Sequence, residues 1–186
     1  ACIMGYAQFA TTDEETWNGN VANGRKLIGL AADLGCPVVR VFGGQWKGLS
    51  RDVAIAQVAR GLNALAPMAE EHGVKVAIET HDDWCKGANL AAVLADVPSP
   101  AVGICWDVAN GSFDEPLATT HAAIADRIHH VHFKDVSLVD GKHKSALMGE
   151  GQVDLVEAIR LLRAGGYDGY LSFEWEKKWQ PEIAEP

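Results

Sequence analysis

The chain has 186 residues, of which 48% are hydrophobic and 22% charged, and its formal net charge is −9. This length allows one sizeable hydrophobic core and is too short for two ordinary domains, so residues 1–186 are predicted to form a single domain. No apolar run approaches the roughly 18–20 residues that a membrane-spanning helix needs. The excess of acidic residues repels phosphate backbones, which argues against nucleic acid as a partner.

Short apolar runs alternate with longer amphipathic stretches along the chain. Most of the runs are continuously apolar rather than alternating, which favours strands buried on both faces, as in a parallel sheet. They cover Cys2–Gln8, Val38–Phe42, Val74–Ile78, Val102–Trp106, Ile128–Phe133 and Tyr170–Phe173. The helices predicted between them cover Arg25–Leu34, Val53–His72, Asn89–Leu94, Glu115–Ile124 and Asp154–Leu162. This alternation predicts an α/β fold with right-handed crossovers.

Two architectures are compatible with this order of elements, a doubly wound sheet and a (β/α)₈ barrel. Doubly wound nucleotide-binding proteins usually carry G-x-G-x-x-G after the first strand, and this motif is absent. The pair Gly43-Gly44 follows a strand but indicates only a tight turn. The four cysteines are scattered without a C-x-x-C pair, which predicts reduced thiols in a cytoplasmic protein.

Residues able to bind a divalent metal stand at the carboxyl ends of separate predicted strands. They are Glu79, Asp107, His132 and Glu174. In α/β folds these strand ends meet at one edge, where active sites lie. Three carboxylates at one edge repel one another unless a cation neutralises them. The set therefore predicts one divalent metal ion, Mn²⁺ first, with Mg²⁺, Co²⁺ or Zn²⁺ as alternatives.

The alternation of side chains along a strand leaves two positions open. His130 and His132 share one strand face, and so do Glu174 and Glu176, so either member of each pair can point inward. His132 and Glu174 are preferred because they come first where the strand ends.

Several segments at these strand ends resemble a known family. They are Ile78–Trp84, Cys105–Val108, His130–Asp135, Gly149–Gly151 and Phe173–Trp179. Together they closely resemble the sugar phosphate isomerase/epimerase group of the xylose isomerase-like TIM barrels, over most of residues 38–186. The resemblance implies that Glu79, Asp107, His132 and Glu174 bind the metal. It also implies that Glu79 and Glu174 form an acid/base pair, which moves a proton next to a carbonyl through an enediolate.

Other side chains near the strand ends are candidates for binding a substrate, a small sugar or polyol. They are Trp46, His81, Asp82, Asn110, Lys134 and Asp135. Asn110 stands where many relatives have a histidine, which argues against a second metal at this position. Lys142–Lys144 precede Gly149–Gly151 and are expected to lie in a mobile loop over the pocket.

A complete (β/α)₈ barrel usually needs about 250 residues, and only about six strands are predicted here. The expected fold is therefore a xylose isomerase-like TIM barrel that lacks the first two βα units. Pairing in a homo-oligomer could complete it. The expected function is that of a metal-dependent sugar or polyol isomerase or epimerase. The alternatives are a dehydratase of inosose or dehydroshikimate type and a catalytically silent, truncated binding domain.

Overall fold

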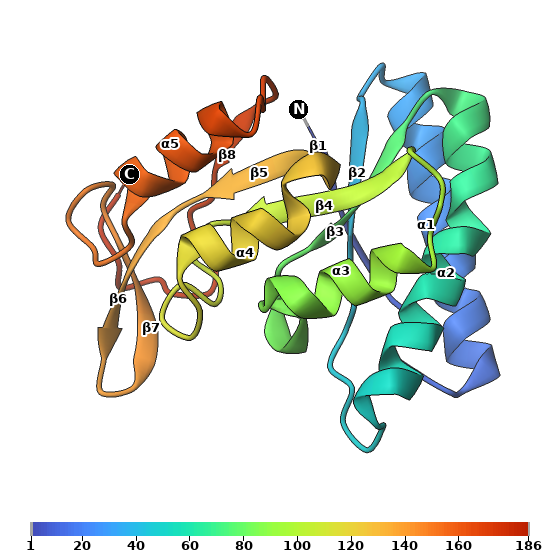
Figure 1. Cartoon of the computed structure of the whole chain (residues 1–186), viewed down its shortest axis with the longest axis horizontal. Coiled ribbons are helices and arrows are strands. Elements are labelled where there is room, and N and C mark those ends of the chain that lie inside the picture. Colours follow the sequence, from blue (N-terminus) through green and yellow to red (C-terminus); the bar gives the residue numbers. More distant parts are fainter. Residues whose placement is uncertain (1, 186) are drawn as a thin grey trace.

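The computed structural model describes residues 2–185, and Figure 1 shows a curved sheet flanked by helices. Six parallel strands form this sheet in the order β1-β2-β3-β4-β5-β8. They are β1 (Cys2–Gln8), β2 (Val38–Phe42), β3 (Lys75–Glu79), β4 (Val102–Asp107), β5 (Ile128–Phe133) and β8 (Leu171–Phe173). All the predicted strands are confirmed, and the parallel order is that of a half-barrel.

Helices connect these strands and pack against one another in chain order. They are α1 (Glu14–Asp33), α2 (Arg51–His72), α3 (Gly87–Ala95), α4 (Leu117–Ile124) and α5 (Leu155–Ala164), with short 3₁₀ turns η1 (Asp82–Trp84) and η2 (Ala125–Arg127). None of the helices within residues 2–185 is both long and apolar enough to cross a membrane.

Helix α1 begins well before the predicted start at Arg25. The Asp13 side chain accepts a hydrogen bond from the Thr16 amide and caps the first turn. Trp17 and Val21 extend the buried face of the helix toward its amino end. Their burial outweighs the low helix propensity of the glycines and asparagines around them.

The segment after β5 forms a β-hairpin rather than the expected loop. Strands β6 (Asp135–Val139) and β7 (Lys142–Ala146) pair antiparallel as a separate two-stranded sheet, which projects from the rest of the fold in Figure 1. Asp140 and Gly141 join them, with φ values of 50° and 73°. Two positive φ angles are those of a type I′ turn, for which Asp-Gly is a favoured sequence.

The carboxyl ends of the central strands lie side by side. Across β3 and β4 Glu79 pairs with Cys105, and across β4 and β5 Asp107 pairs with His132. The stagger between strands therefore brings inward-facing residues of successive strands to one edge of the half-barrel.

Candidate metal centre

Four side chains converge at this edge, one from each of β3, β4 and β5 and one just after β8. They are Glu79, Asp107, His132 and Glu174, and one donor atom from each lies within 4.8 Å of the others. Glu79, Asp107 and His132 are at most 1% exposed, whereas the Glu174 side chain is 24% exposed. His130 and Glu176, which the sequence left open as alternatives to His132 and Glu174, are not among the four clustered donors. His130 contacts the Ser172 hydroxyl at 2.8 Å, and Glu176 contacts Lys134.

Asp107 has one oxygen held by the backbone and one facing the centre. Its Oδ1 accepts hydrogen bonds from the amides of Ala109 and Asn110, at 2.9 and 3.0 Å. The Asp107 backbone is also tied to Thr80, whose Oγ1 accepts from the Asp107 amide and donates to its carbonyl. This arrangement leaves Oδ2 as the oxygen available to a cation.

Glu79 is held in a similar way by Arg40, a residue that sequence reasoning missed. Arg40 Nε lies 2.9 Å from Glu79 Oε2, and a second guanidinium nitrogen donates to the Gly5 carbonyl at 2.9 Å. The buried guanidinium stacks on Phe42, with 3.9 Å from its carbon to the ring centre. A lone arginine within the apolar run Val38–Phe42 was the available signal, because buried arginines are rarely unpaired.

Lys134 directly follows β5, and its side chain enters the centre with only 7% of its surface exposed. Its ammonium lies 2.9 Å from Asp107 Oδ2, 2.9 Å from Glu174 Oε2 and 3.0 Å from Glu176 Oε1. These acidic neighbours outweigh the effect of burial and raise the pKa of Lys134, so the side chain stays charged.

The charges of the centre do not balance. Four carboxylates, those of Glu79, Asp107, Glu174 and Glu176, face the two permanent cations Arg40 and Lys134. Burial raises the pKa of Asp107 to about 7, with further contributions from the negative charges of Glu174 and Glu79. Burial acts in the same direction on Glu174, but Lys134 more than offsets it and holds that pKa at about 2. When Asp107 is ionised, the four carboxylates outnumber the two permanent cations, and a divalent cation would neutralise this excess.

The donor atoms also fit a metal ion. His132 Nδ1 lies 3.5 Å from Glu79 Oε1 and 3.8 Å from Glu174 Oε2. It makes no hydrogen bond with any of the described residues. Ligands bound at about 2.0–2.2 Å around one ion are separated by roughly 3–4 Å, which matches these distances.

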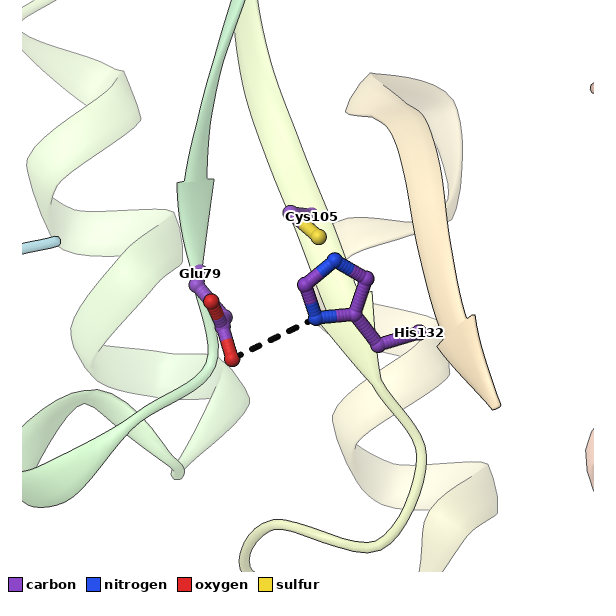
Figure 2. Close-up of side chains that lie close together, drawn as sticks. All are labelled: Glu79, Cys105 and His132. Carbon is purple, nitrogen blue, oxygen red and sulfur yellow. Dashed lines mark ion pairs between the residues drawn. The ribbon is translucent and has the colours of Figure 1, made fainter. Parts of the chain in front are cut away.

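Cys105 forms an alternative set with Glu79 and His132, and Figure 2 shows all three side chains. The figure places the sulfur near the ring nitrogen that is turned away from Glu79. Complete burial, together with the negative charge of Glu79, raises the Cys105 pKa well above its usual value. Because metals bind the thiolate, this thiol is a poor ligand and the set with three carboxylates fits better.

A cavity of about 380 Å³ opens over the centre. It is lined by Tyr6, Gln8, Arg40, Phe42, Glu79, His81, Lys134, Glu174, Glu176 and Trp179. Two of the predicted substrate-binding residues, His81 and Lys134, therefore line it. Tyr6 and Phe42 were not anticipated, because nothing in an apolar run identifies which of its side chains reaches a cavity.

The other predicted substrate-binding residues are engaged elsewhere. The side-chain amide of Asn110 donates a hydrogen bond to the Thr80 carbonyl. Asp135 accepts from the amides of Gly149, Gly151 and Val153, and so fixes the loop before α5.

Trp46 and Asp82 border a neighbouring hollow of about 410 Å³ rather than the cavity itself. Trp46 packs edge-on against Trp84 there. Asp82 reaches back toward the cavity, because its Oδ2 lies 2.9 Å from His81 Nδ1.

Comparison with known proteins identifies relatives of this chain. Inosose dehydratase of Klebsiella pneumoniae is 27% identical over 193 residues, which covers 89% of this chain and 62% of the relative. Fructoselysine 3-epimerase of Escherichia coli O157:H7 is 27% identical over 132 residues, covering 66% of this chain and 46% of the relative. The chain thus spans less than two thirds of the length of either curated relative.

Solved structures share the fold. The IOLI protein, solved with a bound zinc atom, superposes with a TM-score of 0.79 at 18% identity, covering 93% of this chain and 66% of that structure. The family model described as xylose isomerase-like TIM barrel matches residues 2–185. This chain therefore belongs to the xylose isomerase-like TIM barrel family.

Proposed function

We propose that this chain carries the active site of a divalent-metal-dependent isomerase or epimerase that acts on a sugar or polyol. The observation that carries this proposal is the buried cluster of Glu79, Asp107, His132 and Glu174 below an open cavity. Three carboxylates and one imidazole suit Mn²⁺, with Mg²⁺, Co²⁺ and Zn²⁺ as alternatives. When bound, the metal would polarise the carbonyl and hydroxyl oxygens of the substrate and stabilise negative charge on them.

Glu174 and Glu79 are proposed to move the proton. Glu174 lines the cavity, and in the metal-free protein it is ionised, which is the state that a base needs. Glu79 comes from the non-adjacent strand β3 and also lines the cavity, where Arg40 fixes its orientation. A substrate held between them could lose a proton to one carboxylate and regain it from the other.

The charges of the cavity favour an uncharged substrate. Arg40 and Lys134 are the only lysine or arginine side chains among the described residues that line it, and both already face carboxylates. A phosphate or carboxylate group on the substrate would find no uncommitted cation there. Tyr6, Phe42 and Trp179 supply apolar surface against which a sugar ring could pack.

A dehydratase is the second candidate, and the pair His81–Asp82 favours it. Dehydration begins with the same proton abstraction, but a hydroxyl group then leaves as water and needs a proton donor. His81 lines the cavity, its Nδ1 lies 2.9 Å from Asp82 Oδ2, and it is the candidate for that proton donor.

The first test is metal content per chain, measured by mass spectrometry on protein purified without chelator. The second follows proton exchange by NMR in D₂O with a panel of ketoses and inososes. We expect deuterium at the carbon next to the carbonyl, and its loss in Glu174→Gln but not in the control Glu71→Gln, an exposed residue of α2. New epimers would identify an epimerase, and an unsaturated product a dehydratase. Metal binding without exchange would contradict catalysis and favour the silent binding domain.

A further inference from the structure

We propose that Lys134 is a built-in competitor of the metal ion. In the metal-free protein its ammonium neutralises Asp107 and Glu174, and metal binding displaces it toward Glu176. The inference rests on the proposed metal-dependent function and describes how the same site is controlled.

The contacts of Lys134 place it on the oxygens that a metal needs. Asp107 Oδ1 is occupied by two backbone amides, so Oδ2 is the oxygen left for a metal. Lys134 Nζ lies 2.9 Å from that Oδ2. It lies equally close, at 2.9 Å, to Oε2 of Glu174, the oxygen nearest His132 Nδ1. The ammonium therefore sits on two of the four predicted ligands.

A metal ion and the Lys134 ammonium would repel each other strongly if both were bound to these oxygens. A metal bound to Asp107 Oδ2 and an ammonium in its present position would lie roughly 4 Å apart. The site is buried, so solvent screens their repulsion only weakly. Metal binding must therefore overcome or displace Lys134.

Glu176 can remain the ion-pair partner of Lys134 when a metal ion binds Asp107 and Glu174. Its Oε1 lies 3.0 Å from Lys134 Nζ, and its Oε2 accepts a hydrogen bond from Gln180 at 2.9 Å. Glu176 is not one of the four clustered donors. Because the lysine side chain is long and flexible, Lys134 can keep this partner while Asp107 and Glu174 bind the metal.

Arg40 shows the contrast within the same site. It holds Glu79 through Oε2, whereas Oε1 of that carboxylate faces His132. Arg40 and His132 thus contact different oxygens of Glu79. Arg40 therefore orients this ligand without competing with a metal ion for Oε1.

The test is a double-mutant cycle on metal-stripped protein, with the Kd for Mn²⁺ measured by calorimetry. Lys134→Met should lower the Kd at least about ten-fold, because the competing charge is removed. Glu176→Gln should raise it several-fold, although Glu176 is not a ligand. In the Lys134→Met background, Glu176→Gln should change the Kd much less.

A second readout is the melting temperature without metal. The Tm of metal-free Lys134→Met should be lower than that of the parent, because buried carboxylates lose their counter-charge. Saturating Mn²⁺ should remove this difference in Tm. If Lys134→Met does not fold, Glu176→Gln still decides, since its side chain is 32% exposed and its loss should be tolerated.

The outcomes separate this inference from the function on which it rests. A parent that binds metal, with an unchanged Kd in Glu176→Gln or an unchanged or higher Kd in folded Lys134→Met, overturns the inference alone. A parent that binds none of Mn²⁺, Mg²⁺, Co²⁺ or Zn²⁺ overturns the proposed function and the inference with it.

Discussion

At the scale of single residues, two ligands of the candidate metal centre are held in position by protein groups that contact only one of their two carboxylate oxygens. Asp107 and Glu79 each have one oxygen fixed by the protein, through backbone amides in one case and Arg40 in the other. The remaining oxygens face His132 and Glu174. Ligands held in this way lose little conformational freedom on binding an ion, which favours affinity and a defined geometry.

The two possible ligand sets make different predictions. Asp107→Asn removes a charged ligand and should weaken Mn²⁺ binding by about 100-fold or more. Cys105→Ala removes a protonated thiol and should leave the Kd within about three-fold of the parent, because a thiol is a poor ligand. Calorimetric titration of both variants checks this. Loss of metal binding in Cys105→Ala, with Asp107→Asn unaffected, would show that the set in Figure 2 is the true one.

Which residues could be foreseen follows from the same geometry. Residues at the ends of apolar runs are predictable, because parallel strands present their carboxyl ends at one edge. Arg40 was missed because its partner, Glu79, lies on the neighbouring strand. The sequence of neither strand reveals the register in which the two strands pair. The hairpin of Asp135–Ala146 was missed although Asp140-Gly141 is a recognised turn pair, because its second strand, Lys142–Ala146, is almost entirely polar.

At the scale of the elements, close packing against the helices limits which glycines can be replaced. Gly61 of α2 lies against Phe9, and a Cβ there would come within 2.4 Å of the ring. At Gly19 of α1, a Cβ would meet no atom within 4 Å other than those of its chain neighbours and its own helix backbone. Both are helical glycines, so they differ mainly in packing.

Replacing each glycine by alanine tests this packing. Gly19→Ala should raise the free energy of unfolding by about 0.5–1 kcal/mol, because alanine has the higher helix propensity. Gly61→Ala should lower it by about 1–3 kcal/mol, since the added methyl group forces Phe9 or the helix to shift. Urea unfolding curves give both values. A stabilising Gly61→Ala would mean that α2 does not pack on Phe9 as described.

At the scale of the whole molecule, the sheet has two edge strands, β1 and β8, and no ladder joins them within residues 2–185. Apolar side chains on both are exposed, including Tyr6 and Phe173. Completion of the barrel by another chain, expected from the sequence, stays a prediction. The four predicted ligands come from β3, β4 and β5 and from the residue after β8, so a bound ion would connect one side of the sheet to its last strand.

Metal should therefore stabilise the whole fold. At a free metal concentration of about 100 times Kd, binding adds about 2.7 kcal/mol, which for a chain of this length is a rise of roughly 5–11 °C in Tm. Calorimetric scans with and without Mn²⁺ measure it, and EDTA should reverse it. Asp107→Asn should show almost no rise. An equal rise in that variant would indicate metal binding at another site.

The last strand of the sheet has a special position in this arrangement. β8 has only three residues, pairs with β5 alone among the described strands, and is followed at once by Glu174. Docking of this strand and capture of the ion are thus reciprocal, and each favours the other by the same free energy. Any change that weakens the docking of the C-terminal segment, such as proteolytic cleavage, a fusion or a competing partner at this sheet edge, would therefore lower the affinity for the metal.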